Sequence, residues 1–258
     1  MSKGRVSKEE QERRIKLLIG FIFTFKYADR RQLEMFIRTV INMTYARRLI
    51  AYCLRKGYIN DYRECLYKTK IYYLTKKGLD FINTEECFAK DYRFEKSSLG
   101  INTFNQHDLA IEAYSQLQKR FNITYWFCAW MLRIGKHRRV TVPDSIIVIQ
   151  HNRAVALEIE TQSKKLSEIR QMIGRYRYYI EKSPQYGAVL MVIEYKAIYE
   201  SIKKKLFHLA PIFCSRAFIL ADLEMLKQGR CFYANEVRSL EEAFNLLREG
   251  RNGQAIQS

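Results

Sequence analysis

The sequence has 258 residues, 48% of them hydrophobic, and its 45 Lys and Arg residues against 27 Asp and Glu give a formal net charge of +18. A chain of this length and apolar content can bury a core in one large or two small domains, which excludes a mainly disordered protein. The positive surplus predicts a polyanionic partner, because neutralised phosphates release condensed counterions. Nucleic acid is the first candidate and an anionic membrane surface is the second.

The sequence argues against a membrane anchor. Its longest apolar run, 17–25, is flanked by lysines and is much shorter than the ~20 residues that a span needs. The six cysteines are scattered without a CxxC pair, which favours buried thiols in a reducing cytoplasm over a zinc site or a disulfide framework. We therefore expect a cytoplasmic DNA-binding protein with no membrane partner.

Residues 1–84 begin with three predicted helices. Apolar residues recur with helical period over 8–27, and Asp29 is expected to cap a second helix. Asn42 or Thr44 is expected to cap a third helix, which stops at Gly57, a residue suited to a left-handed C-cap.

Two strand-like stretches, 58–62 and 70–74, follow these helices, and residues 74–79 lead from a strand into a capped helix. Three helices and a two-stranded wing form a winged helix-turn-helix, and the phrase Tyr-Tyr-Leu-Thr-x-x-Gly at 72–78 resembles the wing ending of many bacterial winged-helix proteins. A protein-docking role is the alternative for such a domain. The side chains expected to contact DNA from the third helix and the wing are Tyr45, Arg47, Arg48, Arg55, Lys56, Arg63, Lys68 and Lys70.

Residues 85–104 are interpreted as a connection to a second domain at 105–258. The order of its expected elements predicts a mixed sheet with helices on its faces, so the whole chain is of the α/β (α+β) class. The expected helices are 105–121, 164–181, 196–209 and 240–247, and the expected strands are 123–132, 145–149, 154–160, 187–193 and 212–220.

Three carboxylates flank the two strands of a predicted hairpin. Asp144 precedes the first strand, and Glu158 and Glu160 close the second on one side, because successive side chains alternate between faces. A three-residue turn over 151–153 places Asp144 opposite Glu160, whereas a two-residue turn pairs it with Ile159 and directs it away. The spacing permits a three-carboxylate site for a hard divalent cation without forcing one.

Two resemblances rest on short motifs around these acids. Pro143-Asp144, thirteen intervening residues and Glu158-Ile159-Glu160 are similar to the PD-(D/E)xK nuclease signature. Together with Asn105-Gln106-His107-Asp108-Leu109, they make the sequence resemble the replication-relaxation family, in which MobC-type plasmid mobilisation relaxases join a winged helix to a restriction-endonuclease-like domain. The resemblance covers about 8–220.

The resemblance implies a metal-dependent endonuclease that nicks DNA at a transfer origin, using Mg²⁺ or Mn²⁺. Its implied partners are double-stranded DNA, a single-stranded segment at the nick, and other mobilisation or conjugation proteins. Asp144 would be the central metal ligand with Glu158 and Glu160 as partners, and Glu112 matches the place of an extra acid. His107 is either a site residue or a capping or core histidine.

The sequence departs from the nuclease signature at Glu160, which stands in place of the usual lysine. Lys164 or Lys165 could reach back to supply that charge. Arg138 and Arg139, in a basic loop, are expected to contact DNA. One helix face could contact a DNA backbone instead of serving catalysis. It carries Lys164, Glu168, Gln171, Arg175 and Tyr178.

Two other functions remain open, and the missing lysine favours the first of them. The chain could be a non-catalytic DNA-binding regulator of replication or transcription with a degenerate nuclease domain. It could also be an accessory protein that brings DNA to a transfer machinery.

Overall fold

The computed structural model describes residues 7–41, 46–64, 69–82, 90–95, 101–135, 141–149, 153–182 and 186–252. The chain divides into two compact units, 1–99 and 100–258, and the division lies within the range 85–104 assigned to the connection. Each unit is described by itself. The predicted residues that lie outside the described ranges are Asn42, Thr44, Tyr45, Lys68, Arg138 and Arg139.

The first unit contains helices and a small antiparallel sheet in which β3 lies between β1 and β2. The sequence predicted only the two strands of a wing; β1 pairs with β3 as a third, and its three residues are too few to show an alternating pattern. The elements are α1 (Lys8–Phe25), β1 (Tyr27–Asp29), α2 (Arg30–Thr39), α3 (Ala46–Lys56), β2 (Ile59–Glu64), β3 (Thr69–Leu74) and α4 (Lys76–Phe81).

Local side chains fix the helix boundaries of this unit. Asp29 accepts a hydrogen bond from the Gln32 backbone N–H at 2.8 Å, which confirms the predicted cap of α2. The Gln32 side chain accepts one from the Asp29 N–H at 2.7 Å and completes a capping box. Gly57 has a φ of +70°, which confirms the left-handed stop after α3. Thr75 caps α4 by accepting from the Gly78 N–H.

The second unit is built on one mixed sheet of seven strands among the described residues, in the order β10-β9-β8-β7-β6-β5-β4. Its elements are α6 (Ile101–Gln118), β4 (Ile123–Cys128), α7 (Ala129–Leu132), β5 (Ser145–Ile149), β6 (Arg153–Glu160), α8 (Leu166–Arg177), the π-helix η2 (Tyr178–Lys182), β7 (Ala188–Ile193), α9 (Lys196–Leu209), α10 (Pro211–Ala217), β8 (Phe218–Asp222), α11 (Leu223–Lys227), β9 (Arg230–Tyr233), β10 (Glu236–Ser239) and α12 (Leu240–Asn252).

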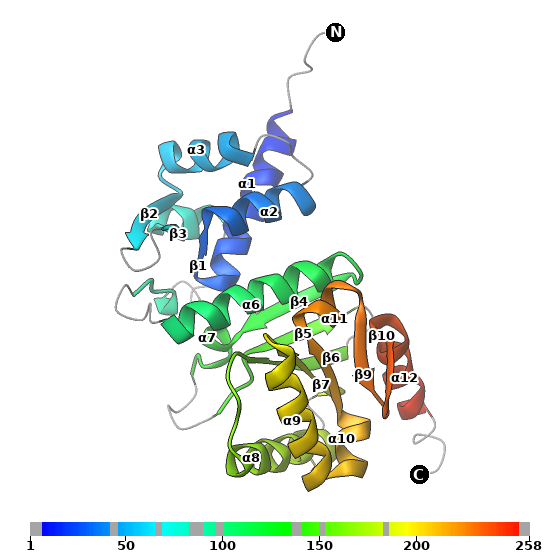
Figure 1. Ribbon diagram of the computed structural model, residues 1–258. Coiled ribbons are helices and arrows are strands. Elements are labelled where there is room, and N and C mark those ends of the chain that lie inside the picture. The colour runs from blue at the N-terminus through cyan, green and yellow to red at the C-terminus, as the bar shows by residue number, and fades with distance from the viewer. Residues whose placement is uncertain are drawn as a thin grey trace. The chain divides into compact units, whose positions relative to one another are not determined.

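The middle strands β6, β7 and β8 are parallel, and the outer pairs are antiparallel. Helix α6 lies on one side of the sheet, and α8, α9 and α10 lie on the other (Figure 1). A hydrophobic core forms under these three helices, where Ala156 and Val189 of the sheet pack with Tyr176 and Ile202. The mixed α/β class predicted from the element order is confirmed.

Two segments of the second unit differ from the prediction. The expected strand 123–132 ends at Cys128 and continues as α7. The expected strand 212–220 is helical up to Ala217, because Pro211 occupies the first turn of α10, where its missing N–H is not needed. The strands β9 and β10 were not predicted.

Across the ranges that the structure describes, no helix combines the length and the apolar character needed to cross a membrane.

Candidate functional site

The register of the β5–β6 hairpin decides where Asp144 lies. Ser145 pairs with Leu157 and Ile149 pairs with Arg153, so three residues separate the paired ends. This register brings Asp144 beside Glu158. The predicted three-residue turn over 151–153 had placed Asp144 opposite Glu160; the observed register is shifted by two, which keeps Asp144 on the same face.

The face that carries these acids is the one covered by α8. Ala156 belongs to the core under α8 and α9, and side chains two and four positions further along β6 point to the same side. Glu158 is 7% exposed and Glu160 is 4% exposed. Two carboxylates are therefore buried at the end of a strand, where each needs a polar partner.

Asp144 is held against β6 by the backbone. Its Oδ2 accepts a hydrogen bond from the Ile159 N–H at 2.7 Å, and its carbonyl accepts from the Ala129 N–H at 2.8 Å. Burial raises the pKa of Asp144, while the Ile159 N–H, the charge of Lys164 and a side-chain hydrogen bond with Glu158 oppose that rise. Asp144 and Glu158 thus form one coupled pair.

Glu158 has two partners from consecutive positions of α8. Arg175 Nη2 lies 2.5 Å from Glu158 Oε1, and the Tyr176 hydroxyl donates to the same oxygen. Burial and the neighbouring charge of Asp144 raise the pKa of Glu158 to about 8, despite the opposing effects of Arg175 and Tyr176. The sequence had placed Arg175 on a possible DNA-facing stripe; its guanidinium instead contacts this buried acid.

Glu160 is paired with the lysine that the sequence proposed as a substitute for the motif lysine. Lys164 Nζ lies 2.9 Å from Glu160 Oε1, and about a third of the Lys164 side chain is exposed. Burial alone would lower the pKa of Lys164, but the hydrogen bond and charge of Glu160, with the charges of Glu158 and Asp144, raise it overall. Lys164 therefore stays protonated beside all three acids.

The acids do not form the three-ligand metal cluster that the family resemblance implied. In the described part of the chain, no group of three or more His, Cys, Asp and Glu side chains is arranged to hold a metal ion. The two glutamates instead contact basic side chains, Glu160 with Lys164 and Glu158 with Arg175. The coupled carboxylates of Asp144 and Glu158 remain a donor set suited to Mg²⁺, which commonly takes one or two carboxylates and keeps several waters.

The two candidates on α6 have other surroundings. Glu112 accepts a hydrogen bond from Gln116 Nε2 at 2.9 Å and interacts electrostatically with Lys227 of α11. His107 is partly buried on the same helix. Neither residue is among the main causes of the pKa shifts of the acids on β5 and β6.

Residues 21–191, more than half of the chain, match the family described as replication-relaxation. The chain belongs to the replication-relaxation family. The match includes Asp144, Glu158 and Glu160 as well as most of the first unit. No curated protein and no solved structure matches the sequence.

The replication-relaxation protein carries exposed basic side chains on α3, β2 and β3 of its first unit. Lys70 Nζ pairs with Asp61 at 2.7 Å across β2 and β3. Arg47 Nε lies 3.6 Å from Glu34 of α2, and four-fifths of the Arg47 side chain is exposed. The predicted DNA contacts that are exposed in the structure are Arg47, Arg48, Arg55, Lys56, Arg63 and Lys70.

The sequence reasoning missed Arg30 and Arg38 of α2, which also pair with Glu34. Their spacing of four residues on either side of Glu34 is the signal that could have found them, because residues four apart are neighbours on a helix.

Proposed function

We propose that this replication-relaxation protein binds DNA through its first unit and nicks one strand with its second, in the replication or mobilisation of a plasmid or integrative element. The observation that carries the proposal is the placement of Asp144 against Glu158 with Lys164 beside them, on one face of the mixed sheet. The family membership supports a role in DNA replication or mobilisation.

The first unit supports DNA binding by its element order and its charge. The succession α1-β1-α2-α3-β2-β3 is that of a winged helix, in which the third helix enters the major groove and the wing contacts the backbone. Arg48 and Arg55 of α3 and Arg63 of β2 are exposed and suited to phosphates and guanine edges. The net charge of +18 favours the same partner.

The second unit supports hydrolysis by its donor set, which is similar to that of PD-(D/E)xK nucleases. Asp144 and Glu158 would hold a divalent cation, which when bound polarises a phosphodiester and lowers the pKa of a water. Arg175 and Tyr176 keep the Glu158 carboxylate in place from α8. A bound phosphate would then complete the oxygen ligands that the two carboxylates alone do not supply.

Lys164 would take the place of the lysine missing from the signature. Glu160 fixes its ammonium group by the 2.9 Å ion pair, and Lys205 fixes its backbone by donating to the Lys164 carbonyl at 2.5 Å. A lysine held in this way can stabilise the charge that develops on a phosphodiester. Glu160 is therefore assigned to positioning Lys164 and not to binding metal.

Supercoiled plasmid carrying the DNA that flanks the chain's own gene tests the proposal, with and without Mg²⁺ or Mn²⁺. We expect nicking by the wild-type chain with the cation, and its loss in Asp144→Asn with DNA binding retained. Glu224→Gln, which removes a 73% exposed carboxylate of the same unit, is the matched control and should nick normally. Nicking by Asp144→Asn at the wild-type rate would exclude this site.

A second function is a DNA-binding regulator without nuclease activity. The absence of the motif lysine favours it, because that lysine helps to position the attacking water. The pairing of Glu158 with Arg175 also favours it, because it engages an oxygen that a cation would need. DNA binding by the wild-type chain with no nicking under either cation would support this function instead.

A further inference from the structure

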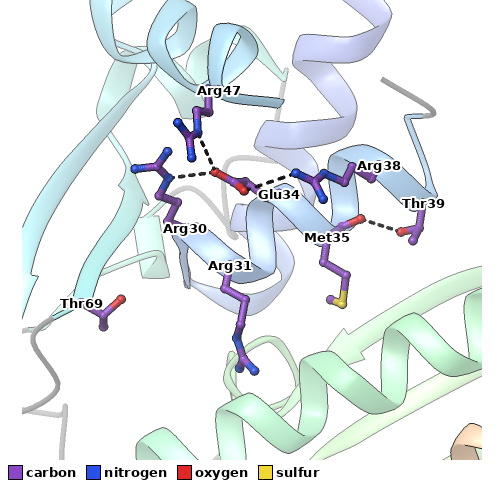
Figure 2. Close-up of a pocket in the computed structure, with 8 residues that line it drawn as sticks. All are labelled: Arg30, Arg31, Glu34, Met35, Arg38, Thr39, Arg47 and Thr69. Carbon is purple, nitrogen blue, oxygen red and sulfur yellow. Dashed lines mark hydrogen bonds and ion pairs between the residues drawn. The ribbon is translucent and has the colours of Figure 1, made fainter. Parts of the chain in front are cut away.

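A surface pocket of about 620 Å³ lies between α2, α3 and the start of β3 in the first unit. Four arginines and a single acid are among its lining residues, so its charge is strongly positive. Arg30, Arg38 and Arg47 are directed toward Glu34, whereas Arg31 is directed away from it (Figure 2). The residues that line it are Arg30, Arg31, Glu34, Met35, Arg38, Thr39, Arg47 and Thr69.

The three arginines around Glu34 are not held equally. Arg30 Nε donates to Glu34 Oε1 at 2.8 Å, and this hydrogen bond is the main cause that lowers the pKa of Glu34. Arg47 Nε lies 3.6 Å from Oε1 and Arg38 Nη2 lies 3.8 Å from Oε2. Arg30 is thus the hydrogen-bonded partner of Glu34, whereas Arg38 and Arg47 make only long ion pairs.

The arginine that is hydrogen-bonded to Glu34 is also the least exposed of the three. The side chain of Arg30 is 48% exposed, that of Arg38 is 65% exposed and that of Arg47 is 80% exposed, while Glu34 is 20% exposed. Long ion pairs between exposed groups are weak. Arg38 and Arg47 can therefore exchange Glu34 for another anion with little loss, and a single carboxylate cannot balance the three arginines that are directed toward it.

We propose that this pocket binds one phosphate of the DNA backbone, with Arg38 and Arg47 donating to its oxygens. Planar guanidinium groups match phosphate oxygens through paired N–H donors. Arg47 stands in the first turn of α3, so a phosphate bound here would lie at the start of the helix expected to read the major groove. The inference rests on the proposed DNA binding of the first unit and assigns Arg47 to the backbone.

Glu34 is a positioning residue in this arrangement. With Arg30 as its close partner, it keeps the guanidinium groups of Arg38 and Arg47 directed into the pocket before DNA binds. It also competes with the phosphate, because both are anions that attract the same two arginines. Removing its charge while keeping a hydrogen-bond acceptor should therefore favour DNA.

The test measures the affinity of the full chain for two duplexes of equal length and unrelated sequence, over a range of salt concentrations. We expect Arg38→Gln and Arg47→Gln each to weaken binding by about 5- to 10-fold, equally for both duplexes, and to lower the salt slope by about one. The double variant should lose less than the product of the two single losses, because both residues contact one phosphate. Glu34→Gln should bind about threefold more tightly.

Matched controls come from α1, where Arg13 Nε pairs with Glu10 Oε2 at 2.7 Å and the Arg13 side chain is 54% exposed. Arg13→Gln and Glu10→Gln change the charge by the same amount outside the pocket, and both should bind within about twofold of wild type. An Arg13→Gln loss as large as that of Arg38→Gln would overturn the inference, since net charge alone would then explain both.

Inorganic phosphate and a nucleoside triphosphate, added at constant ionic strength, distinguish a backbone phosphate from a free one. Weak binding of both probes supports a backbone site. The inference is overturned if the wild-type chain binds either probe tightly and Arg38→Gln abolishes that binding while its affinity for the duplexes stays unchanged. If the wild-type chain binds no duplex, the proposed function itself fails; if it binds and the pocket variants match it, only this inference fails.

Discussion

Arg175 of α8 and Glu158 of β6 meet at 2.5 Å between Nη2 and Oε1, although they are 17 positions apart in the sequence. Tyr176, the next residue of α8, donates to the same oxygen, so one acid of the sheet receives two adjacent side chains of one helix. This contact ties α8 to the end of β6, and it determines how the buried acids respond to mutation and pH.

The hydroxyl of Tyr176 is expected to stabilise the second unit. Tyr176→Phe keeps the ring, which packs edge-on against Tyr186 and Phe218, but removes a donor to the buried Glu158 oxygen. We expect a loss of about 1–3 kcal/mol in the free energy of unfolding. Both tryptophans of the chain lie in the second unit, so urea unfolding followed by tryptophan fluorescence measures it.

Tyr195→Phe is the control for this change, since Tyr195 is 57% exposed and its hydroxyl contacts the Glu194 side chain at the surface, where a hydrogen bond contributes little. Its unfolding curve should match that of the wild type. Equal stability of Tyr176→Phe and wild type would show that the Glu158 contact contributes nothing.

Glu158 should make the second unit less stable as pH rises. Its pKa in the folded state is about 8, above the ordinary 4.5, so the folded chain keeps a proton that the unfolded chain releases. Stability from this group is complete below the unfolded pKa and falls until the pH reaches the folded pKa. Glu158→Gln stays neutral and lacks this loss.

We therefore expect Glu158→Gln to gain stability over wild type as pH rises from about 5 to about 8, by a few kcal/mol at most. Fluorescence-detected urea unfolding at several pH values measures the difference. Parallel pH profiles for the two proteins would contradict the raised pKa, and Glu224→Gln should run parallel to wild type.

Lys164 is expected to stabilise the ionised form of Glu160. Lys164→Met leaves that buried carboxylate without its cation, which should cost about 1–3 kcal/mol near neutral pH, discounted because the lysine is partly exposed. The cost should shrink at acid pH, where Glu160 is protonated in both states. Lys164→Arg should recover most of the stability. Equal stability of Lys164→Met and wild type near neutral pH would disprove the role of the ion pair.

Gly78 is expected to tolerate no side chain, because the backbone approaches it closely. A Cβ built there would lie 2.1 Å from the Tyr58 carbonyl oxygen, which also accepts from the Thr75 N–H at 3.1 Å. Gly78→Ala should therefore destabilise the first unit by about 2–3 kcal/mol. Melting followed by circular dichroism measures the loss, and the tryptophan signal of the second unit should not change.

Gly20→Ala is the matched control within the same unit. Gly20 lies inside α1, and apart from the adjacent helix backbone no atom lies within 4 Å of an added Cβ, so the substitution should stabilise the helix by about 0.5–1 kcal/mol. If the melting temperature of Gly78→Ala rose above that of the wild type, as that of Gly20→Ala should, the close approach to Tyr58 would have no energetic consequence.

The sequence alone determined the features that depend on neighbouring residues. The cap at Asp29, the left-handed stop at Gly57 and the strand 145–149 follow from local hydrogen bonding, backbone freedom and periodicity. Alternation along a strand also placed Glu158 and Glu160 on one face. The prediction of a strand over 212–220 was wrong for most of that run, because buried helices and buried strands share the same apolar pattern.

Only the tertiary structure decided the features that depend on pairing between distant segments. The register of the hairpin placed Asp144 beside Glu158, and the packing of α8 brought Arg175 and Tyr176 to the same acid. The meeting of Arg47 with Glu34 likewise needs α2 and α3 to pack together. Periodicity indicates which side of a helix or strand is apolar, but side-chain packing throughout the core determines which other element that side contacts.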